Sequence, residues 1–300
     1  MIDTLVISIG GIKGISFIGV LDELFKKISI DDIKFIIGSS VGSIIGILLS
    51  IGYKPDEIYS ICTEIDFAKF TLNPVDQLHE CINDEICNLD NLNNFGLDNC
   101  NGLIRLLKSI IQIKCSPNIT FKEHYEKYNK ELTIVATNID ELKSEYFNYK
   151  SNPNDKIIDI VKLSISIPII YIMQNHNNIN YTDGGISDYY PIEFYNKETS
   201  IGICLIKTNN NIKKNNENFI NYLYNIVNSL EIYMNSLLRK LYNKYTIFID
   251  TNIISLNKKH PGDFNIKSEH KEKLYKLGKE LFIKYYEKNT DRFIKNTDKL

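Results

Sequence analysis

The stretch Phe35-Ile36-Ile37-Gly38-Ser39-Ser40-Val41-Gly42-Ser43-Ile44-Ile45-Gly46 decides how the chain folds. Its first three residues are aromatic or β-branched, as in a buried strand, and the apolar residues after Gly42 recur at helical spacing. Between the two lies the pattern G-x-S-x-G, from Gly38 to Gly42. This pattern places a serine on a tight turn whose flanking glycines tolerate the crowding, so that the hydroxyl projects from the backbone. Ser40 is therefore a candidate nucleophile.

The same segment also has features of a membrane helix. Residues 35–53 carry no charge, and Gly38, Gly42 and Gly46 are spaced as in a helix dimerisation face. A membrane helix would run without interruption, whereas this segment begins as a strand and is broken at the Gly-Ser-Ser turn. We therefore predict strand, turn and buried helix, with no transmembrane span. The glycines would let the helix approach the sheet closely.

The residues before this segment repeat its pattern. Residues 4–9 form an apolar run of strand length, the loop Gly10-Gly11-Ile12-Lys13-Gly14 follows, and apolar residues at 15–25 recur at helical spacing. Together with residues 33–50 they make a β-α-β-α unit. Such a unit predicts an α/β fold with a mostly parallel sheet.

The rest of the chain continues with further strands and helices. We predict helices opening at Pro55 and over about 75–87, 103–113, 157–163, 219–241 and 269–288, and strands over 131–138, 146–149, 201–206 and 245–250. The apolar side of 103–113, with Ile110 and Ile111, indicates either core contact or an interfacial face. Because no long linker interrupts the chain, we predict a single domain over 1–300. Its motif-bearing core covers about 4–207, and a C-terminal helix-strand-helix portion over about 219–290 packs on it.

Composition limits the classes of function. With 43% hydrophobic and 24% charged residues the chain resembles a soluble globular protein, and its net charge of −2 gives no reason to expect a nucleic-acid partner. The six cysteines include no C-x-x-C pair and the histidines lack metal-ligand spacing, so we expect reduced thiols and no metal. Residues 1–5 lack the basic start and apolar core of a signal peptide. We therefore expect a cytoplasmic location, with peripheral membrane contact as an option.

Three groups are needed for acyl transfer from an ester: a nucleophile, a base, and donors for the developing oxyanion. Ser40 supplies the first, and the helix after it directs its positive N-terminus at the hydroxyl. The loop Gly10–Gly14 follows the neighbouring strand, at the edge where ligand sites of such sheets gather. We predict that this loop forms the oxyanion hole.

The base can be assigned in two ways. A triad in the chain order serine, aspartate, histidine would use His260 or His270, but both lie in the context of surface residues. Asp183 ends a strand-like segment and is followed by Gly184 and Gly185, which leave space beside its carboxylate. The residues alone leave both assignments open.

Nucleotide binding is excluded by spacing. The loop at 10–14 is not a G-x-G-x-x-G fingerprint, because position 9 is Ile9, and no Gly-Lys-Ser/Thr follows. We therefore predict no cofactor.

Taken together, three ordered motifs resemble the patatin-like phospholipase family. That family carries a G-G-G-x-[KR]-G loop, a G-x-S-x-G turn and an Asp-Gly-[Gly/Ala] motif, matched here by residues 9–14, 38–42 and 183–185. Shorter matches lie at 17–21, 164–168 and 190–192, and residues 274–282 resemble its closing helix. The likeness spans most of the chain. It implies a three-layer α/β/α architecture around a mostly parallel sheet.

The resemblance also implies a function. Ser40 would attack the ester carbonyl and Asp183 would act as the base, without a histidine, through an acyl-enzyme that water hydrolyses. The substrate would be a phospholipid, lysophospholipid or neutral lipid ester, met at a membrane or lipid-droplet surface. The sequence departs from the family pattern at Ile9, which replaces the first glycine of the loop.

Two alternatives remain at this stage. The first is a catalytically silent lipid-binding module with the same fold, which the departure at Ile9 suggests. The second is a conventional α/β-hydrolase with a Ser-His-Asp triad, although the nucleophile of that class normally follows several strands.

Overall fold

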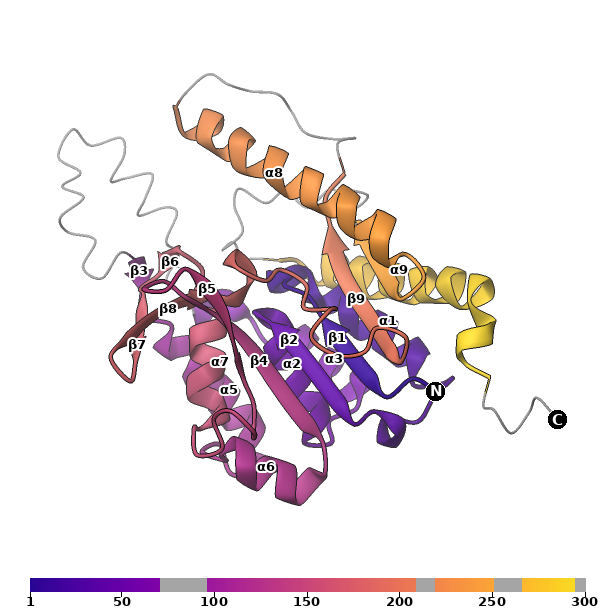
Figure 1. The fold of residues 1–300 in the computed structure, drawn as a ribbon, viewed down its shortest axis with the longest axis horizontal. Helices are drawn as coiled ribbons and strands as arrows, with labels where there is room; N and C mark the ends of the chain where they lie inside the picture. The colour runs from indigo at the N-terminus through magenta and orange to yellow at the C-terminus, as the bar shows by residue number, and fades with distance from the viewer. Residues whose placement is uncertain (71–95, 209–218, 251–265, 295–300) are drawn as a thin grey trace.

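The computed structural model describes residues 1–70, 96–208, 219–250 and 266–294 (Figure 1). Within these residues eight strands form one sheet in the order β10-β9-β1-β2-β4-β8-β7, with β5 paired to β4. The strands are β1 (Thr4–Ile7), β2 (Phe35–Ser39), β3 (Gly96–Asp98), β4 (Glu131–Asn138), β5 (Lys143–Phe147), β6 (Ile169–Tyr171), β7 (Gln174–His176), β8 (Ile179–Asp183), β9 (Ser200–Ile206) and β10 (Thr246–Asp250). The small sheet β3-β6 lies outside this order.

The central part of the sheet is parallel. The neighbours from β10 through β9, β1 and β2 to β4 all pair in parallel, whereas β4 pairs antiparallel with β5 and β8, and β8 with β7. The predicted α/β fold with a mostly parallel sheet is confirmed. Strand β1 shows why the centre is apolar, since Leu5 and Ile7 enter the core on one face and Val6 enters it on the other.

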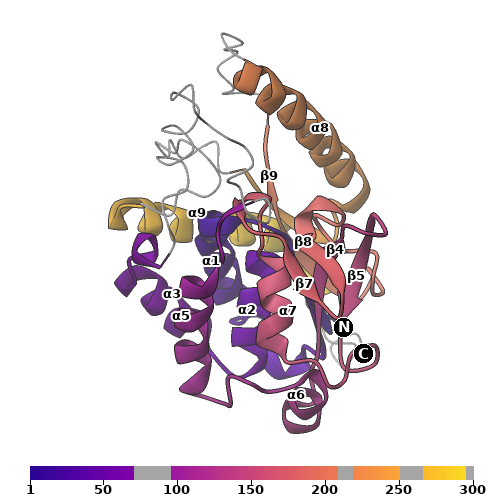
Figure 2. The same ribbon diagram turned by 90° about the vertical axis from the view of Figure 1, so that its left-hand side faces the viewer.

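Most of the helices cover the face of the sheet to which Leu5 and Ile7 belong. The helices are α1 (Ile15–Leu24), α2 (Val41–Ser50), α3 (Pro55–Glu64), α5 (Asn101–Gln112), α6 (Phe121–Tyr128), α7 (Ile157–Ser164), α8 (Phe219–Tyr242) and α9 (Ser268–Lys288). The larger core cluster joins α1, α2, α7 and α9 to the sheet. Figure 2 shows α1, α3 and α5 together on this side. The other face packs against Tyr190, Ile192 and the end of α8 at Leu238 and Tyr242.

Helix α9 packs on α1 through two glycines. A Cβ atom on Gly19 would lie 2.0 Å from the carbonyl oxygen of Tyr275, and one on Gly278 would lie 1.9 Å from that of Ser16. Because any side chain here would collide with backbone, the two helices cross at close range. The closing helix expected over 274–282 thus contacts α1 directly.

Most predicted elements agree with the structure, and one strand does not. The strand predicted over 146–149 is wrong in position, because β5 runs from Lys143 to Phe147 and Asn148 begins a turn. Its side-chain Oδ1 accepts hydrogen bonds from the backbone N–H groups of Lys150 and Ser151, which ends the strand. The helix predicted over 75–87 lies outside the described residues. Within those residues, no helix is both long enough and apolar enough to cross a membrane.

Candidate active site

The predicted turn joins β2 to α2 at Ser40. Ser40 has φ 53° and ψ −124°, a left-handed conformation that costs free energy in a residue with a side chain. A Cβ atom on Gly38 would lie 2.3 Å from the carbonyl group of Gly42, and one on Gly42 would lie 2.4 Å from the carbonyl oxygen of Ile7. Both positions therefore require glycine. The turn is held against β1 by this close approach.

The Ser40 hydroxyl is in direct contact with Asp183. Its Oγ donates a hydrogen bond to Oδ2 of Asp183 at 2.7 Å, and both residues are buried. The other carboxylate oxygen, Oδ1, accepts a hydrogen bond from the backbone N–H of Gly185 at 2.8 Å. A Cβ atom on Gly184 would lie 2.3 Å from the carbonyl oxygen of Val135, so this turn also needs a glycine. Strand β8 thus delivers the carboxylate to the end of β2.

Burial changes the acidity of Asp183. Desolvation raises its pKa from 3.8 to about 6, and the hydrogen bonds from Ser40 and Gly185 oppose the rise because they favour the charged form. At neutral pH the carboxylate is ionised. It is also a stronger base than an exposed aspartate, which suits it to accept a proton from a hydroxyl.

Ser164 supports the strained turn. The backbone N–H of Ser40 donates a hydrogen bond to Oγ of Ser164, the last residue of α7, at 2.9 Å. Ser164 is fully buried. In the sequence, Ser164 stands out only as part of the match at 164–168, and no role for it is predicted. The sequence feature that could have indicated its role is a serine at the end of a helix of buried residues.

We expect Ser164→Ala to lower both stability and reactivity. The variant leaves the buried N–H of Ser40 without an acceptor, which costs about 1–3 kcal/mol of unfolding free energy. It also releases the turn, and we expect labelling of Ser40 by a fluorophosphonate to slow by roughly 10-fold. Ser166→Ala is the matched control, because the Ser166 hydroxyl donates to the carbonyl of Lys162 and not to the turn. Equal labelling rates in the two variants would contradict this role.

The glycine loop lies beside Ser40. Residues Gly11–Gly14 form a short 3-10 helix, η1, and Gly11 has φ +50°. The N–H of Lys13 donates to the carbonyl of Gly10, so the amides of Gly11 and Ile12, which precede it, have no acceptor within η1. Gly11, Ile12 and Ser40 line one cavity. The predicted loop and Ser40 thus border the same cavity.

Ile9 lies outside this group of donors. Its backbone N–H donates to the carbonyl oxygen of Tyr189 at 3.4 Å. Its side chain fills the space beside Gly185, where a Cβ atom would lie 2.5 Å from Cγ2 of Ile9. The residue that replaces the first loop glycine is thus bonded to Tyr189 and packs beside Gly185.

Comparison with known families places the chain in one of them. A family model described as patatin-like phospholipase matches residues 5–194, which include Ser40 and Asp183 and make up more than half of the chain. The chain belongs to the patatin-like phospholipase family. The resemblance seen in the three sequence motifs is confirmed.

Two viral proteins are similar to this chain. A probable lipid hydrolase of Invertebrate iridescent virus 6 is 38% identical over 200 residues, which are 65% of this chain and 65% of that protein. An uncharacterised protein of Acanthamoeba polyphaga mimivirus is 33% identical over 291 residues, covering 92% of this chain and 91% of that protein. The first match thus spans slightly less than two thirds of its relative.

Two solved structures share the patatin-like fold. VipD from Legionella pneumophila aligns with a TM-score of 0.60 and 17% identity, over 96% of this chain and 67% of VipD. The structure of the ExoU-SpcU complex of Pseudomonas aeruginosa aligns with a TM-score of 0.54 and 18% identity, over 96% of this chain and 51% of that one. At these identities the likeness concerns the fold alone. This chain spans about half of the latter.

The described histidines of this patatin-like chain lie away from Ser40 and Asp183. His124 contacts the Ser50 hydroxyl through Nε2, and His176 contacts Asp155. His270 lies near the start of α9. Among the described residues, no histidine is hydrogen-bonded to Ser40 or Asp183. His79 and His260 fall outside those residues.

An apolar cavity opens next to Ser40. It has a volume of about 120 Å³ and lies between α1, α2, α3 and α5, with Ile44, Ile58 and Ile110 among its lining residues. Of the two isoleucines considered for an interfacial face, Ile111 is buried in the core and Ile110 faces this cavity. The apolar side of α5 therefore makes core contact.

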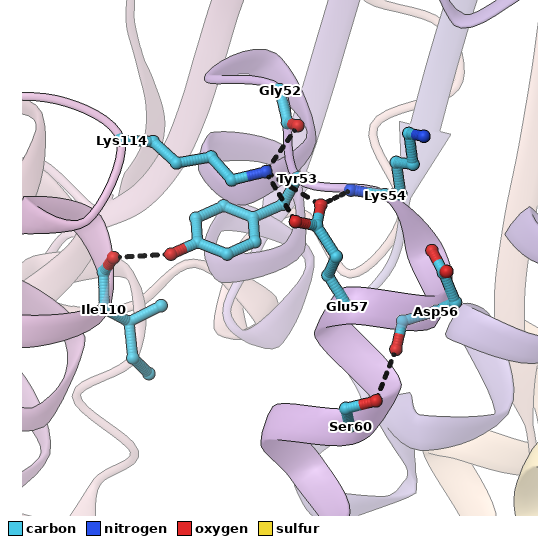
Figure 3. A network of polar contacts seen from close by, with 8 residues as sticks. All are labelled: Gly52, Tyr53, Lys54, Asp56, Glu57, Ser60, Ile110 and Lys114. Carbon is cyan, nitrogen blue, oxygen red and sulfur yellow. Dashed lines mark hydrogen bonds and ion pairs between the residues drawn. The ribbon is translucent and has the colours of Figure 1, made fainter.

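A polar network fastens α5 beside the cavity (Figure 3). The Lys114 ammonium donates to both carboxylate oxygens of Glu57, at 2.9 and 2.7 Å, and to the carbonyl of Gly52 at 2.8 Å. The Tyr53 hydroxyl donates to the carbonyl of Ile110 at 2.7 Å. These bonds join the end of α5 to the connection between α2 and α3.

We expect Lys114→Met to lower the unfolding free energy by about 1 kcal/mol. The ion pair itself contributes little because Glu57 is 42% exposed, and the cation-π contact with Tyr53 adds a similar amount. Hydrogen bonds from Lys114 and from the Lys54 amide lower the pKa of Glu57 below 4.5. Its contribution is therefore present above that pH and is lost as the pH falls through the lowered pKa. Thermal unfolding of Lys114→Met is compared with that of Lys122→Met, a control at an exposed lysine. Equal stability of the two variants would contradict a stabilising role for Lys114.

Proposed function

We propose that this protein hydrolyses acyl esters of lipids, with Ser40 as the nucleophile and Asp183 as the general base. The observation that carries the proposal is the 2.7 Å hydrogen bond from the Ser40 hydroxyl to a buried carboxylate whose pKa is about 6. Asp183 is placed to receive the proton as Oγ attacks the carbonyl carbon.

The reaction then proceeds in two halves. The tetrahedral intermediate collapses to an acyl-enzyme on Ser40, and the leaving alcohol takes the proton from Asp183. Water then attacks the acyl group while Asp183 accepts a proton from the water. Asp183 passes this proton to the Ser40 oxygen as the fatty acid leaves. Each half returns the carboxylate to its charged form.

Backbone donors support the negative charge that develops on the carbonyl oxygen. The amides of Gly11 and Ile12 lack acceptors within η1, and the positive end of the α2 dipole lies at Ser40. Lys13 follows these amides and Gly14 ends the loop; a Cβ atom there would lie 3.0 Å from Val41. The silent-module alternative rested on Ile9. Because the Ile9 amide already donates to Tyr189, we assign the oxyanion to the amides of Gly11 and Ile12 alone.

The cavity supports a lipid as the substrate. Apart from Ser40 and the loop, it is lined mainly by apolar side chains from four helices, which suits an acyl chain held beside the nucleophile. The relative named a probable lipid hydrolase points to the same class. The cytoplasmic location and the single domain over 1–300 remain predictions.

Product analysis tests this function. The protein is incubated with phosphatidylcholine vesicles, lysophosphatidylcholine micelles or a triacylglycerol emulsion. Mass spectrometry then quantifies the released fatty acids and the remaining lipid. We expect fatty acid release from at least one of these esters with equimolar loss of substrate. No release from any of them, beyond that of a Ser40→Ala preparation, would overturn the proposal.

A further inference from the structure

Helix α8 exposes an apolar stripe along one side. Five of its large side chains are 42–63% exposed: Ile226, Leu230, Tyr233, Met234 and Leu241. They occupy positions i, i+4, i+7, i+8 and i+15, which fall on one face of a helix. Both views show α8 standing apart from the layered body of the molecule (Figures 1 and 2). We call these five residues the α8 stripe.

The opposite face of α8 anchors the helix to the body. The Lys207 ammonium donates to Oδ1 of Asn228 at 2.8 Å and pairs with Glu231 at 2.9 Å. Leu238 and Tyr242 pack against the second core cluster. Since these contacts fix the rotation of the helix about its axis, the α8 stripe faces away from the part of the body that the structure describes.

The anchor places α8 next to the catalytic loop. Lys207 directly follows β9, and β9 runs parallel to β1, which leads into the loop at Gly10–Gly14. The charges of Lys207 and Glu231 both act on the pKa of Lys13 in that loop, the first lowering it and the second raising it. The anchoring side of α8 at Glu231 therefore lies near the loop.

We propose that the α8 stripe docks this protein on an anionic phospholipid surface; this rests on the proposed function, because the surface supplies the lipid ester. The only acidic residue of α8 is Glu231, which Lys207 neutralises, while Lys240 is exposed one helical repeat of seven residues after Tyr233, at the edge of the stripe. A helix with an apolar face and a cationic flank binds in the headgroup region of such membranes. A stable protein partner would need roughly 20–30 residues a side, far more than the α8 stripe offers.

Paired variants separate docking from catalysis. In Leu230→Gln/Leu241→Gln the stripe loses two side chains, 63% and 61% exposed, and glutamine keeps the helix. The matched control is Ile113→Gln/Leu142→Gln, whose side chains are 74% and 84% exposed elsewhere. We expect the α8 variant to sediment with vesicles of phosphatidylcholine and phosphatidylglycerol on the order of 30-fold more weakly, and the control to bind as the wild type does.

A charge variant tests the lipid class. We expect Lys240→Gln to weaken binding to the phosphatidylglycerol vesicles by roughly 5-fold, and to leave binding to pure phosphatidylcholine vesicles unchanged. Hydrolysis of vesicle lipid should fall with binding in both α8 variants. Hydrolysis of water-soluble p-nitrophenyl butyrate should not change, because the catalytic residues are intact.

Three outcomes would overturn the proposal. Unchanged vesicle binding in the Leu230→Gln/Leu241→Gln variant removes its basis. If light scattering then shows a wild-type dimer and a monomeric variant, the α8 stripe binds a second copy; if the variant instead unfolds at a lower temperature, the chain itself covers the stripe. Because sedimentation needs no turnover, failure of the proposed function, seen as no hydrolysis of any ester by the wild type, is recorded separately.

Discussion

The Ser40→Ala variant is expected to lose ester hydrolysis by a factor on the order of 10⁴ or more. Removing a serine nucleophile abolishes the covalent route and leaves only the stabilisation from the loop and the binding site. The alanine methyl group occupies the same turn and keeps the same φ, so the fold should persist. Initial rates with p-nitrophenyl butyrate and with the lipid substrate measure the loss.

Ser39 provides the control for this variant. It precedes Ser40, is fully buried, and its Oγ has no hydrogen-bond partner. Ser39→Ala should therefore retain the wild-type rate. A Ser40→Ala protein with undiminished activity would remove Ser40 from the mechanism.

The Asp183→Asn variant is expected to lose activity by roughly 10³- to 10⁴-fold. An amide keeps the shape of the carboxylate but cannot accept the proton from Ser40. In the wild type the rate should rise with pH and reach a plateau above about 6, the pKa of Asp183. Asp188→Asn is the matched control, because Asp188 is also largely buried and accepts a hydrogen bond from the Tyr146 hydroxyl at 2.7 Å. Full activity in Asp183→Asn would exclude the carboxylate as the base.

The same variant should be more stable than the wild type at neutral pH. Folding raises the pKa of Asp183 from 3.8 to about 6, so between these values the folded protein keeps a proton that the unfolded chain has lost. Wild-type stability therefore falls as the pH rises through this window. Asparagine avoids the burial of charge, and the gain should reach about 3 kcal/mol above the window and vanish below it. Thermal unfolding at several pH values follows the difference, and equal stability throughout would refute it.

Much of the site could be predicted from local sequence. Gly38 and Gly42 flank Ser40 because backbone from the helix and from β1 passes too close for a side chain, and that demand is visible as a short motif. Gly184 marks the turn after Asp183 in the same way, since the backbone of Val135 passes beside it. The order of strand, loop and helix then placed Gly10–Gly14 beside Ser40, because parallel strands end at the same edge.

Other features depend on contacts between distant parts of the chain. The bond from the Ser40 amide to Ser164 joins residues 124 positions apart, and no local pattern distinguishes Ser164 from other buried serines. The direction of β8 was likewise unpredictable, since its antiparallel pairing with β4 depends on the hairpin with β7. The strand over 146–149 was misplaced because the Asn148 side chain ends β5. The α8 stripe could not be predicted either, because the sequence does not show which face of this helix packs against the body.

The most direct test of the Ser40–Asp183 dyad is to trap the nucleophile. The wild type, Ser39→Ala, Ser40→Ala and Asp183→Asn are each treated with a fluorophosphonate, and peptide mass spectrometry locates and quantifies the adduct. We predict one adduct, on Ser40, in the wild type and in Ser39→Ala, formed much more slowly in Asp183→Asn and absent in Ser40→Ala. An adduct on another residue, or labelling of Ser40 at an undiminished rate in Asp183→Asn, would contradict the dyad.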